Sequence, residues 1–535
     1  MRFNLLTEPW LPVRRKSGLS DRIAPWQVAG GDDPPVALAA PRPDFQAALH
    51  EFLIGLLQTA CPPKDDTAWR QWLANPPESG GLRQVLEPLE PYFELLGERP
   101  LFLQDLELTA KDGVTNSVNA LFITEPTGKT LSDGTDFFLK RGRVETLCPA
   151  CAVMALYTLQ AFAPSGGQGH RTGLRGGGPM STIVRGNDLW TTLWSNVQPL
   201  RGKEALPSRK ELPGKVFPWA VPTVTSQDGK AFNPTQAHPL HCFWAMPRRI
   251  VLLPQEEPAA CDVCGQESSV VIREYVTKNF GYNYGETWVH PLTPYRDQGP
   301  DKPLFSVKGK AQITGYQHWM GLVYGNSREH VLKTKPAACV ASFRNLGTGN
   351  GCLLMAGGYD MDNMKAVQWC EGQFPILRLP NENDEEWLEF FREEVDRLVA
   401  ATDGMRRNLT GALKAALLGD RSKAKVTQGM LEEVSNEVWN RTEAPFYDLV
   451  SRLASSLDDE EASLVLREEW SALLCRTAID LFQHYVLSGR FQAEQAKRAY
   501  DAFNNMKKFN WGLLRKILDL PKQQPDKTQS GGTAP

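Results

Sequence analysis

Two pairs of cysteines with the spacing Cys-x-x-Cys offer the clearest chemistry in this sequence of 535 residues. Cys148 and Cys151 lie in the segment LCPACA, and Cys261 and Cys264 lie in ACDVCGQ. Each pair can hold a metal ion from a tight turn, and two pairs complete the tetrahedral four-thiolate site that zinc favours. Four protein ligands leave no position for a catalytic water, so the sequence predicts one structural zinc ion per chain, joining two distant segments.

The alternative for the first pair is a redox-active dithiol, because a CPAC sequence near the start of a helix can lower the pKa of a thiol. The second pair, with Gly265 after it as a small residue suited to a tight turn, favours a shared metal ion. The remaining cysteines follow no pattern and are predicted to be buried thiols in a reducing compartment. They are Cys61, Cys242, Cys339, Cys352, Cys370 and Cys475.

A glycine-rich segment, PSGGQGHRTGLRGGGP, follows the first cysteine pair over residues 164–179. Glycine at this density removes side chains, so the backbone can lie against a ligand, and Arg171 and Arg175 are expected to supply charge for phosphates. A flexible surface loop is the alternative, and composition alone does not separate the two. A phosphate-binding P-loop is disfavoured because no Gly-Lys-Ser/Thr ends the run.

Two basic segments are candidates for contact with nucleic acid. In the segment before Cys148, basic and aromatic residues alternate, which suits phosphates and bases. The second segment lies near the C-terminus and has few acidic residues. A solvated charged surface is the alternative for both. The residues are Lys129, Phe137, Phe138, Lys140, Arg141 and Arg143 in the first segment, and Lys497, Arg498, Lys507, Lys508, Arg515 and Lys516 in the second.

Composition is that of an ordinary globular protein, and the length allows large cores. The net charge of -3 does not indicate wholesale binding to a polyanion, so charge must be considered segment by segment. The N-terminus has no signal-peptide pattern, and no apolar run is long enough to span a membrane. A cytoplasmic location without membrane contact is therefore expected.

An α+β fold is predicted for the first part of the chain. Residues 1–380 are rich in Gly, Pro and Trp, and short apolar runs at 249–254 and 269–276 are broken by turn residues. This composition and these short apolar runs indicate an irregular mixed α/β domain with long loops, held together by the four-cysteine zinc site. Helical spacing of apolar residues predicts helices over 44–60 and 152–162.

The spacing of apolar residues changes after this domain. Apolar residues recur at helical spacing in several long stretches, which predicts a C-terminal four-helix bundle over 381–520. The tail 521–535 has almost nothing to bury and is predicted to be disordered. The helical stretches begin at Trp387 and continue near 428–456, 461–488 and 491–518.

No catalytic motif is recognisable in the sequence. The histidines are dispersed, and neither HExxH nor GxSxG occurs. The chain is therefore not expected to be an enzyme. Two alternatives stay open: a zinc-dependent nucleic-acid-processing enzyme whose active site forms no motif, and a structural zinc protein without a nucleic-acid role.

The order of motifs resembles a known family. The opening FNLLTEPWLPVRRKSG is followed by LCPACAV, the glycine-rich loop with LRGGGPMSTIVRGNDLW, then CDVCGQES, VASFRNLG and LLMAGGYDMDN. In this order the motifs resemble the large subunit (CasA family) of the type I-E CRISPR surveillance complex, Cascade. The resemblance covers nearly the whole chain.

The resemblance implies a non-catalytic subunit that works with the other Cascade subunits and the crRNA. Such subunits recognise the short PAM in double-stranded DNA from the minor groove, help to open the duplex for pairing with crRNA, and provide a docking surface for the helicase-nuclease. The family's PAM-contacting loop is the glycine-rich one, and glycine suits a narrow groove with coarse readout. It corresponds here to Ser165, Gly166, Gly167, Gln168 and Gly169.

The chain departs from the family pattern at two positions. Asn279, with Lys278 beside it, stands where the family has a PAM-contacting lysine, and Asn279 lacks the reach and charge of lysine. Asn363, between Asp362 and Met364, stands where well-known members carry a glutamine wedge. Asn363 and Met364 can still wedge between base pairs, since apolar side chains commonly intercalate. PAM preference therefore stays open.

The resemblance also assigns roles to both basic segments. The segment before Cys148 corresponds to a loop that anchors the subunit near the 5′ handle of the crRNA, although the loop is longer here. The expected contacts are Phe122, Lys140, Arg141 and Arg143. In the last helix, Lys507 and Lys508 are expected to contact flanking or displaced DNA.

Overall fold

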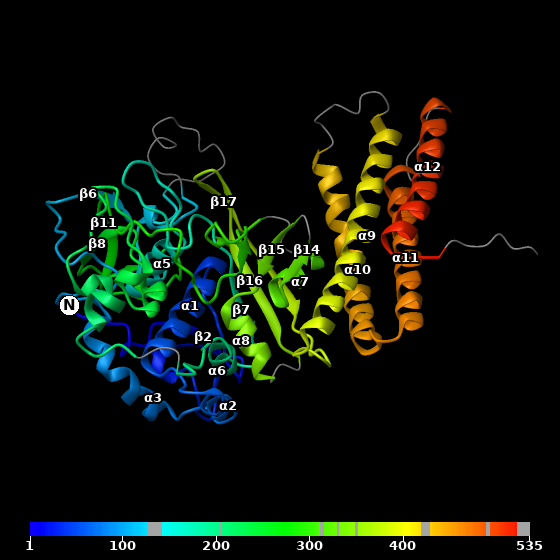
Figure 1. Ribbon diagram of the computed structural model, residues 1–535. Helices are drawn as coiled ribbons and strands as arrows, with labels where there is room; N and C mark the ends of the chain where they lie inside the picture. Colours follow the sequence, from blue (N-terminus) through cyan, green and yellow to red (C-terminus); the bar gives the residue numbers. More distant parts are fainter. Residues whose placement is uncertain are drawn as a thin grey trace, which may run out of the picture. The chain divides into compact units, whose positions relative to one another are not determined.

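The chain folds into two compact units (Figure 1). In the computed structural model, unit 1 comprises Met1–Thr314 and Gly321–Ile376, and unit 2 comprises Gly315–Met320 and Leu377–Pro535. The division between the large N-terminal part and the helices thus falls at Ile376, and the short segment from Gly315 was not predicted to accompany the helices. The structure describes residues 1–125, 142–202, 206–310, 315–328, 331–347, 351–418, 428–487 and 493–521. The predicted tail beyond residue 521 lies outside this range.

Unit 1 contains several short antiparallel sheets. The apolar runs at 249–254 and 269–276 form neighbouring strands, as their β-branched composition predicts. The three-stranded sheets, in hydrogen-bonding order, are β3 (Ser20–Ile23), β2 (Leu11–Arg15) and β4 (Pro35–Leu38); β17 (Lys365–Pro375), β16 (Leu353–Asp362) and β7 (Ser181–Arg185); and β6 (Val114–Ser117), β11 (Val271–Lys278) and β8 (Arg249–Gln255). The four-stranded sheet has the order β13 (Phe305–Ser306), β12 (Tyr295–Asp297), β15 (Val331–Lys335) and β14 (Asn326–Arg328). The two-stranded sheets pair β1 (Phe3–Asn4) with β5 (Glu94–Leu96), and β10 (Glu267–Ser268) with β9 (Ala259–Ala260).

Two buried helices form the centre of unit 1. They are α1 (Pro43–Ala60) and α5 (Pro149–Phe162), which pack against each other and confirm the predicted helices. Gly55 allows a close approach here, because a Cβ atom at this position would lie 2.9 Å from the ring of Phe243. The other α-helices among the described residues of the N-terminal region are α2 (Asp66–Ala74), α3 (Ser79–Leu86), α6 (Leu189–Trp194), α7 (Trp319–Val323) and α8 (Ala338–Leu346).

An aromatic cluster fills the space beside α1 and α5. Its rings meet mostly edge to face, the arrangement that their quadrupoles favour. Because each ring buries a large apolar area, this cluster contributes strongly to the stability of unit 1. The rings belong to Phe52, Phe93, Phe102, Tyr157, Trp219 and Trp244.

Four long helices make up most of unit 2, and Figure 1 shows them side by side. Asp384 and Asp459 accept hydrogen bonds from backbone amides in the first turns of two of them, which satisfies donors that a helix start leaves unpaired. Across the described residues, none of the helices has the length and low polarity that crossing a membrane requires. The four helices are α9 (Glu385–Leu418), α10 (Gln428–Ser456), α11 (Glu460–Phe482) and α12 (Ala493–Ile517).

Tyr316 explains why Gly315–Met320 belongs to unit 2. Its ring is fully buried and stacks on Phe446, with ring centroids 4.0 Å apart. Its hydroxyl donates to Thr402 at 2.9 Å and is hydrogen-bonded to Thr442 at 3.0 Å. A buried hydroxyl needs such partners, so this short segment is joined to α9 and α10 by packing and by polar contacts.

Candidate functional site

The four predicted metal ligands converge in unit 1. The Sγ atoms of Cys148, Cys151, Cys261 and Cys264 all lie within 4.8 Å of one another, and those of Cys148 and Cys264 are 3.8 Å apart. A tetrahedron with metal–sulfur bonds of about 2.3 Å has edges of about 3.8 Å. None of the four cysteines forms a disulfide. The cluster therefore has the ligand type and the size of a tetrahedral four-thiolate metal site.

Each pair is presented by a short, well-defined element. Cys148 is the N-cap of α5, Pro149 occupies the first helical position, and Cys151 follows in the first turn, where the helix dipole favours a thiolate. The second pair lies in the turn between β9 and β10. In that turn the amide of Gly265 donates to the Cys261 carbonyl at 2.8 Å, and Gly265 has a φ of +71°, which favours glycine.

Asp262 joins the second cysteine turn to the segment that precedes the first pair. Its carboxylate accepts hydrogen bonds from the backbone amides of Glu145 and Thr146, both at 2.8 Å. Its own amide donates to the Thr146 carbonyl at 3.0 Å. The two cysteine turns are therefore held together by backbone contacts in addition to any shared metal ion.

Arg22 is a contact that sequence analysis missed. This partly buried residue of β3 donates a hydrogen bond from Nη2 to the Cys264 Sγ atom at 3.3 Å. Four thiolates around a divalent cation carry a net charge of -2, so the guanidinium offsets part of a partly buried negative charge. No local spacing could reveal this contact, because the two residues are 242 positions apart.

The cysteine thiols lie close enough together to influence one another's ionisation. Hydrogen bonds from Cys148 and Cys151 hold the pKa of the Cys261 thiol well below its ordinary value. A zinc ion would supply a rigid link between the two turns, since thiolates are its preferred soft ligands.

The glycine-rich loop uses its glycines in two different ways. A Cβ atom on Gly166 would lie 2.9 Å from the His170 Cβ atom, and one on Gly169 would lie 2.7 Å from the Asn279 Cβ atom. Both glycines are therefore required by packing inside the protein. Gly167 has a φ of +90°, and a Cβ atom there would meet nothing within 4 Å. The backbone at Gly167 thus presents an open outer face.

Asn279 is placed against this loop. Its Nδ2 atom donates to the Gln168 carbonyl at 3.0 Å, and the amide of Phe280 donates to the Gly169 carbonyl at 2.8 Å. One proton of the Asn279 amide group and its Oδ1 atom stay available for another partner. Lys278, the last residue of β11, is exposed.

The expectation that Arg175 supplies charge for phosphates is wrong. Its side chain is 2% exposed and pairs with both carboxylate oxygens of Glu51, at 3.0 and 2.9 Å. A buried carboxylate requires a cation, and Arg175 fills that need. Arg171 is half-buried, and its guanidinium donates to the Ser226 hydroxyl and carbonyl, both at 2.8 Å. Both arginines serve the loop's own structure.

The predicted wedge residues lie at the tip of the β16–β17 hairpin. Asp362 pairs with Lys365, which leaves Asn363 and Met364 as a two-residue turn. Asn363 has a φ of +54°, a conformation that asparagine tolerates better than most residues, and Met364 is 53% exposed. The far end of the glycine-rich segment packs on this hairpin, since a Cβ atom on Gly178 would lie 2.5 Å from the Met361 Cγ atom.

The predicted crRNA-handle residues have different surroundings. Phe122 is 3% exposed and packs against Phe45, with the Arg42 guanidinium 5.0 Å above its ring. Its side chain therefore anchors the start of the loop in the core. Arg143 is exposed. Lys140 and Arg141 lie outside the described residues.

In unit 2, Lys507 and Lys508 are exposed on α12. The Lys507 ammonium group lies 5.2 Å from the centre of the Phe503 ring. Tyr500 and Trp511 expose more than half of their surface on the same helix, which sequence periodicity did not reveal.

Comparison with known proteins identifies the family. The sequence model described as CRISPR-associated protein Cse1 matches residues 4–481. The chain belongs to the CRISPR-associated Cse1 family. Cse1 is the large subunit of the type I-E Cascade complex, so the resemblance inferred from the order of motifs is confirmed.

Solved Cse1 structures share the fold. The structure of Thermobifida fusca Cse1 is similar with a TM-score of 0.70 and 17% identity, over 97% of this chain and 98% of that chain. Cse1 from Acidimicrobium ferrooxidans has a TM-score of 0.67 and 18% identity, over 97% and 99%. A chain of a CRISPR RNA-guided surveillance complex is similar with a TM-score of 0.65 and 16% identity, over 95% and 99%.

The metal site leads to a first prediction. Replacing Cys261 and Cys264 together with serine should reduce bound zinc from one equivalent to none and lower the melting temperature of unit 1, because the link between the two turns is lost. Metal content by mass spectrometry and thermal unfolding by circular dichroism measure both effects. Cys475→Ser, in α11, is the control and should change neither. One equivalent of metal in the double variant would contradict the shared site.

A second prediction concerns Arg22. Arg22→Ala should speed the transfer of zinc to a chromogenic chelator by roughly 10- to 150-fold, because a charged hydrogen bond to a thiolate contributes about 1.5 to 3 kcal/mol. Arg22→Lys should lie between wild type and Arg22→Ala. Arg296→Ala, which removes an exposed arginine of β12, is the matched control. Equal transfer rates for Arg22→Ala and Arg296→Ala would show that Arg22 does not act on the metal site.

Proposed function

We propose that this Cascade large subunit recognises the PAM in double-stranded DNA from the minor groove. It then promotes opening of the duplex for pairing with crRNA, so that an R-loop forms, and it helps to recruit the helicase-nuclease. It acts in the cytoplasm as a non-catalytic subunit. Sequence readout is left to crRNA pairing, and the protein reads the PAM and the shape of the duplex.

The outward face of Gly167 carries this proposal. The minor groove is narrow and offers few distinguishing groups, so a backbone without a side chain can approach base edges that a bulkier loop could not reach. Gly166 and Gly169 hold the loop from inside, and Gly167 has open space in front of it. The loop is thus rigid on its inner side and unobstructed on its outer side.

Asn279 and the hairpin tip support the later steps. Asn279 is tied to the Gln168 carbonyl and keeps an amide proton and an oxygen for a base edge. Exposed Asn363 and Met364, with Asp362 beside them, suit insertion between base pairs beside the PAM. Lys278 is exposed beside Asn279 and would contact a phosphate.

The remaining parts have supporting roles in this proposal. One structural zinc ion is held by the four cysteines, and α9–α12 form a four-helix bundle on which Lys507 and Lys508 contact flanking or displaced DNA. Arg143, with Lys140 and Arg141, contacts the 5′ handle of the crRNA, and Phe122 anchors that loop.

A zinc-dependent nucleic-acid-processing enzyme is the alternative, and the ligand set does not favour it. Among the described residues, the four cysteines are the group able to hold a metal ion. Four protein ligands leave no open position for a water or a phosphate.

Gly167 provides a sharp test of PAM reading. Gly167→Asn should weaken binding of the reconstituted complex to PAM-containing duplex at least tenfold, because the new side chain would project into the groove. Gly18→Asn is the matched control, since Gly18 has a φ of +89° and equally open surroundings.

Asn279→Ala should reduce discrimination against PAM-mutated duplex by roughly 5- to 100-fold, the loss of one base-edge contact. The proposal would be wrong if Gly167→Asn and Asn279→Ala both bound every duplex with the wild-type affinity.

The hairpin tip is tested by strand opening. Asn363→Ala should slow R-loop formation on linear DNA more than on negatively supercoiled DNA, whose stored strain already favours opening. Permanganate reactivity of unpaired thymines measures the rate on both templates. An equal slowing on both would assign Asn363 to binding instead of to opening.

A further inference from the structure

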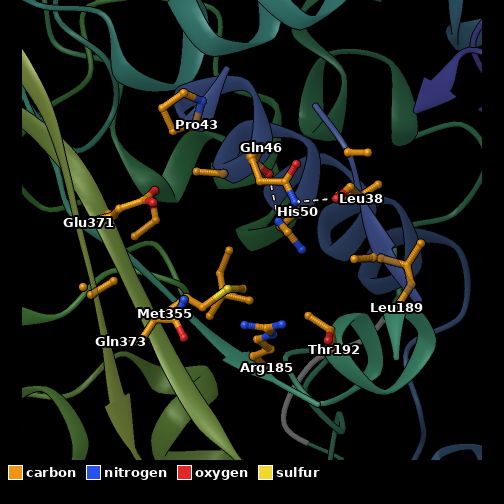
Figure 2. A pocket seen from close by; sticks show the side chains of 18 of the residues that line it. Leu38, Pro43, Gln46, His50, Arg185, Leu189, Thr192, Met355, Glu371 and Gln373 are labelled. Atoms are coloured by element: carbon orange, nitrogen blue, oxygen red, sulfur yellow. Dashed lines mark hydrogen bonds between the residues drawn. The ribbon is translucent and has the colours of Figure 1, made fainter. Parts of the chain in front are cut away.

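A cavity of about 570 Å³ lies in unit 1 between β4, α1, β7, α6 and the β16–β17 hairpin (Figure 2). Its volume is in the range of small-molecule sites. None of the residues assigned above to metal, PAM, wedge or crRNA lines it. Much of its wall is apolar, including Val36, Leu38, Ala47, Ile183, Leu189 and Met355.

His50 presents an unused hydrogen-bond acceptor to this cavity. It lies on α1, is 5% exposed, and its Nδ1 atom is 2.8 Å from the Gln46 carbonyl oxygen. A carbonyl only accepts, so Nδ1 carries the proton and Nε2 is an acceptor in the neutral ring. Burial lowers the pKa of His50 to about 4, which keeps the ring neutral near pH 7. Figure 2 shows the ring pointing into the cavity.

Arg185 presents an unused cation from the opposite side. It ends β7 and is exposed, and in Figure 2 its guanidinium points toward the ring of His50 across the cavity. Across the described part of the chain, its side chain has no hydrogen bond or ion pair. Arg14 of β2 also lines the cavity, is exposed, and is equally without a described partner. Two uncompensated guanidinium groups in a concave site favour an anionic ligand.

Glu371 restricts which anionic ligands can fit the cavity. Its side chain lines the cavity from β17, and its Oε2 atom accepts a hydrogen bond from Trp369 Nε1 at 3.2 Å. The Oε1 atom has no described partner. A carboxylate beside an anion site repels a simple anion, but it accepts hydrogen bonds from neutral hydroxyl groups. The ligand should therefore combine an anionic group with hydroxyl groups placed apart from it.

We propose that this cavity binds one ribonucleotide. The edge of the base offers an N–H group to His50 Nε2 and an acceptor to the Arg185 guanidinium, while its flat faces contact the apolar wall. The ribose hydroxyls donate to Glu371, and the phosphate lies at Arg14. An aromatic carboxylate would satisfy an arginine but leave His50 without a donor and Glu371 without a hydroxyl. The nucleotide comes either from solution or from single-stranded RNA, and both offer the same groups.

Calorimetric titration of the purified chain tests the site. The probes are AMP, GMP, CMP and UMP, their deoxy counterparts, a short single-stranded RNA, and benzoate as an anion without N–H or hydroxyl groups. We expect saturable binding of at least one ribonucleotide, several-fold weaker binding of its deoxy form, and none of benzoate. Binding of RNA alone assigns the site to an RNA nucleotide, whereas tighter binding of a monophosphate assigns it to a free nucleotide.

Variants decide whether that binding uses the cavity. Arg185→Gln should weaken it at least tenfold, as expected for a lost charge-assisted contact, and the matched Arg296→Gln should not change it. Ala47→Phe should abolish binding by filling the cavity, with circular dichroism as the check on folding. The proposal is overturned if no ribonucleotide or RNA binds, if benzoate binds as well as AMP, or if Arg185→Gln behaves as Arg296→Gln. It does not depend on PAM recognition, because the site residues differ.

Discussion

The meeting of the two cysteine pairs is the contact on which the arrangement of the glycine-rich loop depends. From Cys148, α5 runs for about 21 Å before the glycine-rich loop begins, and after Cys264, β11 runs for about 26 Å to Asn279. The two segments contact each other, and their far ends meet again in the hydrogen bond from Asn279 to Gln168. A small cluster of thiols, with Asp262 beside it, therefore sets the geometry of a loop one helix length away.

Positive charge near the glycine-rich loop is directed inward. Arg175 neutralises Glu51, Arg171 is bonded to Ser226, and Arg248 is held beneath the loop with its pKa lowered to about 10 by burial. Arg248 Nη2 donates to the Pro164 carbonyl at 2.5 Å, and its Nε atom is buried without a hydrogen-bond partner among the described residues. These cations stiffen the loop, so its outer face presents backbone. In the proposed function, such an outer face suits the shape of a groove better than it attracts the phosphates of any DNA segment.

Local patterns predicted the local structure well. Apolar spacing located α1, α5 and the four long helices, because residues three and four positions apart share a helix face whatever the rest of the chain does. Helix α9 continues to Leu418, beyond the apolar stretch from which the sequence predicted it. The sequence did not predict that the segment around Tyr316 packs with the helices of unit 2. A single helical turn has no apolar periodicity that could indicate which helices it contacts.

The sequence by itself determined the family and the four cysteines that cluster, because short Cys-x-x-Cys spacings and an ordered set of motifs are properties of the chain alone. Only the tertiary structure decided which side chains face which partner. It turned Arg175 into the core, brought Arg22 to Cys264, separated the outward Gly167 from the inward Gly166, and placed His50 opposite Arg185. The partners of Arg175 and Arg22 and the residue opposite His50 come from different elements, and the two glycines differ in what packs against them. Their contacts follow from how helices and sheets pack, which no local spacing encodes.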